Sequence, residues 1–491
     1  MTGSFGGRRL SRRSLIATGA ALLGAGTVTK IISTPTPAAA APGSAWRALA
    51  KQLDGRLLRP GDAGYVAAAH TFDPRRDDQR PIAIVRVAGS DDVAAALAFC
   101  RQYRISPRPR AGGHSYVGAS TGNGVMVIDT GALDTIHYDP DSKIVTIGPG
   151  VRLGDLHAVL DRQGRTVPTG TCPTVGAAGL TLGGGLGTES RLYGLTADAL
   201  TAATLVNPSG HIYQPSADRD EELLWGLRGG GGGNFGIVTR LSYRTQPALP
   251  GTIFRLAWGR TDNHRVLLGW QERLAQLPRH SWANLHLDSA GGSVTPSITG
   301  VCWGSSATQQ INALINAVGK QPLDRRIYPE SHAGAMSWFA GGAEGYLRQS
   351  WYAGSDVVGH TISSERAAEI VGTVASWNGI GGAAAIFDPL GGAVTDPRVD
   401  DTAFRWRNAH ASTQWYVGLA STSHSNVARA ADWVSRCHAA AEGSSVGGYI
   451  NYLEPHRELR SYYGGHYERL VALNKKYDRD GILNSGYSLP G

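Results

Sequence analysis

Residues 166–187 read TVPTGTCPTVGAAGLTLGGGLG, and residues 108–118 read RPRAGGHSYVG. From Gly176 to Gly187 six residues are glycine and none is charged. Such a run makes a poor surface helix, because each glycine costs about 1 kcal/mol relative to alanine. It lets backbone N–H groups come close to a ligand, and successive N–H groups in a tight loop form an anion-binding nest. The two segments therefore predict a pair of loops that hold a pyrophosphate and the edge of a ring system.

Each of these loops also carries one reactive side chain, Cys172 in the first and His114 in the second. A lone cysteine is usually a small buried hydrophobe, and a histidine in a glycine loop is usually a polar turn residue. As a pair, however, the motifs R-P-R-A-G-G-H-S and T-G-x-C-P-T-V-G-x-x-G-x-x-x-G-G-G-x-G resemble one family. It is the berberine-bridge-enzyme-like branch of the vanillyl-alcohol oxidase / p-cresol methylhydroxylase flavoprotein superfamily. The resemblance runs from about residue 73 to the C-terminus and is weakest between residues 251 and 388.

The resemblance implies an FAD-linked oxidoreductase with one flavin bonded to two side chains. In that branch the matching histidine bonds the flavin 8-methyl carbon and the matching cysteine bonds ring carbon 6. FAD is therefore expected to be covalently bound to His114 and Cys172. A valine at the position of Val175 is associated in the family with oxygen access, whereas leucine marks dehydrogenases. Further FAD contacts are expected from Arg110, Ala111, Gly112, Gly113, Ser115, Gly118, Gly176, Gly179, Gly183, Gly184, Gly236, Ile237, Val238 and Asn451.

A third glycine-rich loop, residues 231–236 (GGGNFG), satisfies the dinucleotide-binding pattern G-x-G-x-x-G. That pattern requires a strand before the loop and a helix after it. Here a helix-like segment at 221–228 precedes the loop, and an alternating strand at 236–245 follows it. The loop is therefore interpreted as a wall of the flavin site, in agreement with the family's G-N-F-G-I-V element.

Residues 1–41 are interpreted as a twin-arginine signal peptide. Arg12 and Arg13 precede an apolar run at 15–28, and small residues at 36–41 suit cleavage. The alternative is a retained membrane anchor, but the apolar run is shorter than the ~20 residues of a spanning helix. We therefore expect the precursor to use the twin-arginine export machinery. The mature protein is expected to be secreted and to have no membrane span.

Length and charge indicate a two-domain globular protein. The chain has 491 residues, 42% hydrophobic and 18% charged. The net charge of +8 includes five basic residues within residues 1–41, so the rest carries about +3 (8 − 5). No basic stripe interleaved with aromatics appears, which argues against nucleic acid as a partner. We predict no disulfide among Cys100, Cys172, Cys302 and Cys437, and no metal site.

Short strands and helices alternate in the first half of the chain. Residues 81–88, 124–129 and 144–150 read as strands, and residues 91–103 and 153–163 read as helices. Ser90 is expected to cap the first helix. The alternation indicates an α+β domain, which the resemblance divides into two subdomains that grip the flavin. Residues 42–250 are assigned to this FAD-binding domain.

A change in composition at about residue 250 marks a second domain. Segments 252–258, 282–288 and 294–303 predict strands, and segments 309–318 and 365–376 predict helices. Residues 412–419 (STQWYVGL) read as a strand with Gln414 and Tyr416 on one face and Trp415 on the other. Residues 251–447 are therefore expected to form a substrate domain with an antiparallel sheet backed by helices. Residues 448–491 return to the FAD-binding domain and end in a helix at 470–477.

The returning segment contains Y-x-N-Y at residues 449–452, which resembles a strand of the family. In related enzymes the second tyrosine is the catalytic base, and it corresponds to Tyr452. On a strand, Tyr449 and Tyr452 would face opposite sides, so only one could meet the flavin. Tyr452 is preferred as the base, and Tyr449 is a candidate substrate contact. Gln414 matches a substrate-binding glutamine of sugar-oxidising members; its alternative is a solvent-facing strand residue.

These features together predict an exported oxidase that acts on an alcohol group of a sugar, oligosaccharide or glycosylated natural product. A base must take the hydroxyl proton as hydride leaves for FAD. Covalent attachment of the flavin leaves an open face for a bulky substrate, and O2 would be reduced to H2O2. Two alternatives remain: an oxidative cyclase or tailoring enzyme of secondary metabolism, and a non-catalytic flavin- or carbohydrate-binding exported protein.

Overall fold

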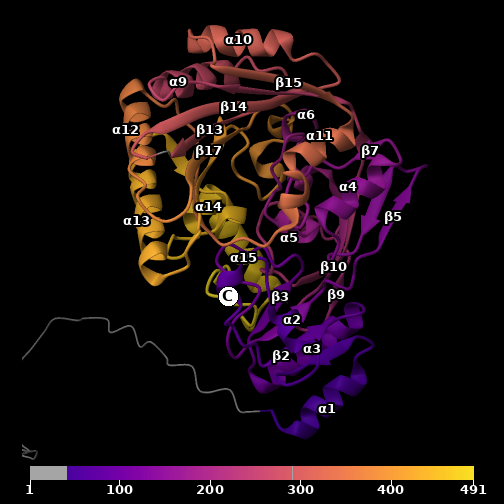
Figure 1. Ribbon diagram of the computed structural model, residues 1–491. Helices are drawn as coiled ribbons and strands as arrows, with labels where there is room; N and C mark the ends of the chain where they lie inside the picture. Colours follow the sequence, from indigo (N-terminus) through magenta and orange to yellow (C-terminus); the bar gives the residue numbers. More distant parts are fainter. Residues whose placement is uncertain (1–40, 290, 491) are drawn as a thin grey trace, which may run out of the picture. The chain divides into compact units, whose positions relative to one another are not determined.

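The computed structural model describes residues 41–289 and 291–490 (Figure 1). The predicted signal peptide lies outside these residues except for Ala41. Within them, no helix is both long and apolar enough to cross a membrane. The fold is α+β, with an FAD-type domain of two small sheets and a second domain on one large antiparallel sheet.

The first small sheet has the order β1-β2-β4-β3, and β2 and β3 run parallel to β4. Its strands and covering helices are β1 (Arg56–Leu58), β2 (Ala83–Arg86), β3 (Pro107–Arg110), β4 (Met126–Asp129), α1 (Gly43–Gln52), α2 (Tyr65–Ala69), η1 (Pro74–Arg76) and α3 (Ser90–Tyr103). The strands predicted at 81–88 and 124–129 and the helix predicted at 91–103 are confirmed. Ser90 is not the cap, because it is the first helical residue and its hydroxyl lies 2.8 Å from that of Thr239.

The second small sheet is antiparallel, with the order β5-β6-β10-β8-β9. Its elements are β5 (Ile136–Asp139), β6 (Ile144–Ile147), β8 (Leu200–Val206), β9 (Ile212–Tyr213), β10 (Ile237–Arg244), α4 (Leu153–Asp161), α5 (Ala177–Leu182), α6 (Ser190–Tyr193), α7 (Thr196–Ala199) and α8 (Glu221–Leu227). β7 (Arg165–Thr166) pairs separately with β11 (Gln246–Pro247).

The glycine run after Gly176 is not entirely loop, because Ala177–Leu182 forms the short helix α5. Tertiary packing overrides the low helix propensity of this segment: Ala177, Ala178 and Leu182 are buried in the core of this subdomain.

The large sheet has the strand order β15-β12-β14-β13-β17-β18-β16-β19. Its strands are β12 (Gly251–Ala257), β13 (Ser281–Ser289), β14 (Val294–Trp303), β15 (Asp324–Glu330), β16 (Trp351–Val358), β17 (Ala383–Pro389), β18 (Ala411–Gly418) and β19 (Ser445–Gly447). The helices α9 (Asn263–Leu274), α10 (Thr308–Val318), α12 (Ser364–Ala375) and α13 (His424–Ala440) pack on one face of it (Figure 1). The predicted antiparallel sheet backed by helices is thus confirmed.

Alternation along these strands decides which side chains reach the opposite face. On β13, Ala283, Leu285 and Leu287 are buried against the helices, whereas Asn284 and His286 point the other way into a cavity. The other short elements are α11 (His332–Phe339), η2 (Gly342–Tyr346), η3 (Gly392–Thr395), η4 (Val399–Asp401), η5 (Ile450–Tyr452), α14 (Arg460–Tyr463), η6 (Gly464–His466) and α15 (Tyr467–Tyr477).

The strand predicted at the Y-x-N-Y segment is wrong: Ile450–Tyr452 forms the 3-10 turn η5. The amide of Tyr452 donates to the carbonyl of Tyr449 at 2.8 Å, which closes the turn. The preceding residue, Gly448, is held by Trp406, whose indole N–H donates to its carbonyl at 2.9 Å. This turn replaces the extended backbone that the pattern suggested.

Candidate active site

A cavity of about 910 Å³ lies where the three glycine-rich loops meet the free face of the large sheet. The loops contribute both reactive side chains, His114 and Cys172, and the sheet contributes Gln414. Most of the predicted cofactor residues line it: Arg110, Ala111, Gly112, Gly113, Ser115, Gly176, Gly179, Gly236, Ile237, Val238 and Asn451. The cavity therefore brings together motifs that lie far apart in the sequence: the loops of His114 and Cys172, the loop at 231–236 and the turn that carries Tyr452.

His114 follows the end of β3 and stands on the cavity wall. Its ring stacks on Phe72, with ring centroids 3.9 Å apart and an interplanar angle of 20°. Its Nε2 is buried and has no hydrogen-bond partner among the described residues. Burial, assisted by the charge of Arg152, lowers the pKa of His114 to about 3. The imidazole is therefore neutral, and it carries a nitrogen that fits a bond to a ligand.

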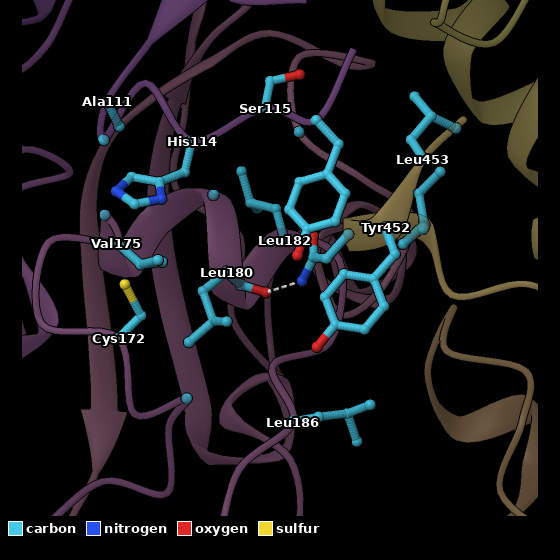
Figure 2. A pocket seen from close by; sticks show the side chains of 18 of the residues that line it. Ala111, His114, Ser115, Cys172, Val175, Leu180, Leu182, Leu186, Tyr452 and Leu453 are labelled. Atoms are coloured by element: carbon cyan, nitrogen blue, oxygen red, sulfur yellow. Dashed lines mark hydrogen bonds between the residues drawn. The ribbon is translucent and has the colours of Figure 1, made fainter. Parts of the chain in front are cut away.

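Cys172 lies on the same wall as His114, and Figure 2 shows Val175 beside both side chains. The thiol is partly buried and forms no disulfide, and its Sγ lies 3.5 Å from Thr174 Oγ1. The other three cysteines are buried and also unpaired. Cys172 is thus the cysteine whose sulfur can meet a ligand in this cavity.

The backbones of the two loops touch each other. A Cβ atom on Gly112 would lie 2.3 Å from the amide nitrogen of Gly176, and one on Gly176 would lie 2.6 Å from that of Gly112. Arg152 fixes the second loop by donating to the carbonyl of Thr174 at 3.0 Å, and the amide of Leu153 donates to the carbonyl of Val175. Glycine is needed at both positions so that His114 and Cys172 share one wall.

Four predicted site residues lie outside the residues that line the cavity. Gly118, Gly183 and Gly184 instead allow close packing, since a Cβ atom there would meet Arg76, Asn451 and Phe404, respectively.

Tyr449, predicted as a substrate contact, is only 2% exposed. Its hydroxyl accepts hydrogen bonds from the amide of Gly185 at 2.9 Å and from Asn451 at 2.8 Å. The assignment of Tyr449 to the substrate is therefore corrected: it is a core residue that braces the glycine loop.

Tyr452 lines the cavity and faces the wall that carries His114 and Cys172 (Figure 2). Its ring stacks on Tyr116 at 5.2 Å and meets Tyr449 edge-on at 5.0 Å. Burial, together with the neighbouring Tyr116, raises the pKa of Tyr452 well above its usual value. The phenol is therefore neutral at physiological pH, and it can accept a proton only while it passes its own proton on.

Two further candidate site residues, Tyr116 and Asp388, were not predicted from the sequence. Tyr116 lies two residues after His114, and its hydroxyl accepts a hydrogen bond from Gln414 Nε2 at 2.7 Å. Asp388 lies on β17 in the cavity, and burial raises its pKa to about 7, with a hydrogen bond from Asn284 opposing the shift. The negative charge of Asp388 is among the causes that raise the pKa of Tyr452, so the two groups interact. The sequence signal that could have identified Asp388 is the alternation of side chains along the strand at 383–389, which places Asp388 on the face opposite Phe387.

These features fit the FAD that the sequence implies. A neutral buried imidazole and a free thiol on one cavity wall, beside glycine loops that add no side-chain bulk, are compatible with a covalently attached flavin. Within residues 41–289 and 291–490 there is no group of three or more His, Cys, Asp or Glu side chains that could hold a metal ion.

Comparison with known proteins agrees with this site. Residues 81–215, which include His114 and Cys172, match the family model of an FAD binding domain. The chain is 29% identical to an uncharacterized FAD-linked oxidoreductase, YvdP of Bacillus subtilis, over 89% of this chain and 98% of that protein. It is 35% identical to a xylooligosaccharide oxidase of Thermothelomyces thermophilus over 39% of each chain.

The fold has a close counterpart among solved structures. Physcomitrella patens BBE-like 1 superimposes with a TM-score of 0.82 over 91% of this chain and 98% of that one, at 24% identity. The matched FAD binding domain, the relatives and the shared two-domain fold agree with one another. The chain is an FAD-linked oxidoreductase, and its two-domain fold is that of Physcomitrella patens BBE-like 1.

Proposed function

We propose that this protein is an oxidase that carries FAD bonded to both His114 and Cys172 and oxidises a hydroxyl group of a sugar or oligosaccharide. One observation carries the proposal: the phenol of Tyr452 stands across the cavity from the two attachment side chains (Figure 2). A substrate hydroxyl between them would meet a proton acceptor on one side and the flavin wall on the other. The similarity to a xylooligosaccharide oxidase supports the sugar.

The chain's own residues supply the proton chemistry. When bound, FAD supplies the hydride acceptor and returns the electrons to O2, which gives H2O2. Tyr452 accepts the proton of the substrate hydroxyl as hydride leaves the adjacent carbon, so that an alcohol becomes a carbonyl. Because its pKa is high, Tyr452 passes its own proton on at the same time. Asp388, with a pKa of about 7, is ionised above neutral pH and interacts electrostatically with Tyr452, and we assign it as the acceptor of this proton.

The other cavity walls suit a saccharide. Polar groups of Gln414, Asn284 and Thr299 line the sheet side, and Trp351 and Tyr416 offer aromatic faces. Hydrogen-bonding side chains beside aromatic faces are the usual composition of a site for a polyhydroxylated ligand. Gln414 keeps its predicted role here as a substrate contact, because its side chain points into the cavity and not into solvent.

We also propose that the protein is exported through the twin-arginine route and that residues 1–41 are its signal peptide. This route transports folded proteins. A protein that acquires FAD before export needs such a route, so the cofactor and the proposed signal agree.

The substrate proposal is tested with a panel of xylo-, cello- and chito-oligosaccharides, their monosaccharides and a set of amines and phenolic alkaloids. We expect peroxide release in air and bleaching of the flavin without oxygen for at least one saccharide series. Bleaching by amines or alkaloids alone would assign the protein to secondary metabolism, and no bleaching by any compound would indicate a binding protein.

Replacing Asp388 by asparagine removes the proposed proton acceptor but preserves the shape of the side chain. In the wild type we expect the rate of flavin reduction to rise as pH passes through about 7, because Asp388 must be ionised to accept a proton. In Asp388→Asn that rise disappears and the rate falls by roughly 10²-fold, as for loss of a positioned acid–base group. Rapid mixing across pH checks this. Asp288→Asn on β13, outside the cavity lining, is the control and should keep the rise.

The oxygen reaction depends on Val175, which lies beside the attachment wall in the cavity. We expect Val175→Leu to slow reoxidation of the reduced flavin by O2 and to leave flavin reduction by substrate largely unchanged, because the larger side chain narrows the approach. Stopped-flow mixing of pre-reduced protein with oxygenated buffer measures the effect. Equal reoxidation rates in the two proteins would remove Val175 from the oxygen path.

A further inference from the structure

A buried ionic cluster lies directly behind the turn that carries Tyr452. It consists of His438 on α13, Asp356 on β16, and Glu454 and Arg457 from the loop after η5. Asp356 and Glu454 are 3% and 6% exposed. Glu454 follows Tyr452 by two residues, so whatever fixes Glu454 also fixes the end of the turn.

His438 joins the two carboxylates through both of its ring nitrogens. Its Nδ1 lies 2.6 Å from Asp356 Oδ2, and its Nε2 lies 2.6 Å from Glu454 Oε2. An ionised carboxylate only accepts hydrogen bonds, and a neutral imidazole has only one N–H. With both carboxylates ionised, this geometry requires an imidazolium with both nitrogens protonated. Its place in the last turn of α13 also favours a cation, through the helix dipole.

Further contacts hold the two carboxylates, while the side chains of His438 and Arg457 remain 24% and 19% exposed. Arg457 donates to Glu454 Oε1 at 2.9 Å and to Asp356 Oδ1 at 3.3 Å. Glu454 Oε1 also accepts from the amide of Ser355 at 3.1 Å. Asp356 accepts from the indole of Trp415 and from the hydroxyl of Ser445, both at 2.7 Å. Two carboxylates are thus balanced by two cations, and the cluster is neutral only while His438 is protonated.

We propose that His438, as an imidazolium, is a positioning residue for Tyr452 and sets the alkaline limit of flavin reduction; this rests on the proposed role of Tyr452 as base. Loss of its proton leaves one uncompensated negative charge among buried groups and breaks the bridge to Glu454. The backbone of η5 is then released from α13, while Ser355 still holds it to β16, and the Tyr452 phenol loses its alignment with the substrate. Misplacement by about 1 Å can cost a catalytic step roughly 10²-fold.

The direction of the pKa shift of His438 agrees with this geometry. Burial alone lowers the pKa of His438, but the hydrogen bonds to Asp356 and Glu454 outweigh it and raise the pKa to about 9. This value lies above the ordinary imidazole pKa of about 6.5. The stabilisation is therefore complete below about pH 6.5 and is lost as pH rises through about 9.

Other groups that face His438 titrate elsewhere. Arg457 has a raised pKa, and Asp356 has a lowered one. The pKa values of Tyr462 and Tyr352, which face Glu454, and of Cys437 on the same helix are all raised, chiefly by burial. Arg436, also on α13, turns outward to Asp432. The pKa of Tyr452 itself lies well above its usual value, so ionisation of Tyr452 does not cause a decrease of the reduction rate near pH 9.

The first test uses flavin reduction by substrate across pH. In the wild type we expect the rate to fall with a midpoint near pH 9. In His438→Gln we expect the reduction rate to be lower by on the order of 10–100-fold and the decrease near pH 9 to be absent. KM should change little. His438→Gln/Glu454→Gln restores charge balance, so its rate recovers toward the wild type while the decrease near pH 9 remains absent. His332→Gln is the matched control, since His332 also bridges two carboxylates, Asp161 and Glu189, but joins α11 to α4.

The second test does not depend on activity. In protein labelled with ¹⁵N-histidine, the His438 signals are assigned by their loss in His438→Gln or their shift in Glu454→Gln. We expect both nitrogens to remain protonated up to about pH 8 and to titrate near 9. A midpoint at or below about 6.5, or a midpoint unlike that of the rate profile, overturns the proposal even if His438→Gln does not fold. If Tyr452→Phe leaves reduction unchanged, the proposed base is wrong, whereas the ¹⁵N titration still reports on His438 itself.

Discussion

Tyr452→Phe is expected to bleach its flavin 10²–10⁴-fold more slowly than the wild type on anaerobic mixing with substrate, the usual cost of removing a positioned base. The phenol hydroxyl is the proton acceptor that we propose, on the side of the cavity opposite His114 and Cys172, and phenylalanine keeps the ring that stacks on Tyr116. Substrate affinity should change far less than the reduction rate, because the lost interaction forms mainly in the transition state. The flavin should remain bound and yellow.

Tyr449→Phe is the matched control for this experiment. It removes the same hydroxyl from a tyrosine three positions earlier, but that hydroxyl is buried against Gly185 and Asn451. We expect a loss of about 1 kcal/mol in the free energy of unfolding and a reduction rate close to that of the wild type. If Tyr449→Phe proves more damaging to flavin reduction than Tyr452→Phe, the base is assigned to the wrong tyrosine.

The second large effect concerns attachment of the flavin. We expect His114→Ala and Cys172→Ala each to keep flavin on the denatured protein through the remaining bond, and the double variant to lose it completely. The reason is geometric: both side chains line one wall of the cavity, so we expect either bond alone to hold the flavin. Absorbance of acid-precipitated protein measures this. Cys302→Ala is the control, because this thiol is buried outside the cavity lining and its loss should leave the flavin in place.

Much of the fold follows from local pattern. Residues 412–419 alternate, and the structure puts Gln414 and Tyr416 on the cavity face of β18 with Trp415 in the core, as the period of a strand requires. Helices with a clear apolar periodicity, such as α10 and α12, also lie within one residue of the predicted bounds. In these segments local preference and tertiary packing favour the same structure.

The Y-x-N-Y segment shows where local pattern fails. Two aromatic residues around Asn451 suit a strand, yet the backbone forms a turn because Ser355 and Trp406, both from the second domain, hold its start. These contacts cannot be seen in the local sequence. Tyr452 was nevertheless correctly expected in the cavity, because that expectation came from a family resemblance and not from the strand argument.

For the site residues too, the local sequence predicts some features and not others. Glycine runs predict close approach of the backbone, but they do not say what approaches. At Gly176 the neighbour is the partner loop in the cavity wall, whereas at Gly183 it is the side chain of Asn451. Asp388 and Tyr116 escaped prediction because their importance arises from neighbours that are distant in sequence, Tyr452 and Gln414.

The double covalent bond is the central claim, and intact-mass and peptide analysis of the denatured wild-type protein tests it most directly. We expect the denatured chain to be heavier by one FAD than its own polypeptide, with or without residues 1–41. After proteolysis we expect one cross-linked species, in which a single flavin joins the peptide of His114 to the peptide of Cys172. A denatured chain with the mass of the polypeptide alone would contradict the account, and so would flavin recovered on one of the two peptides only.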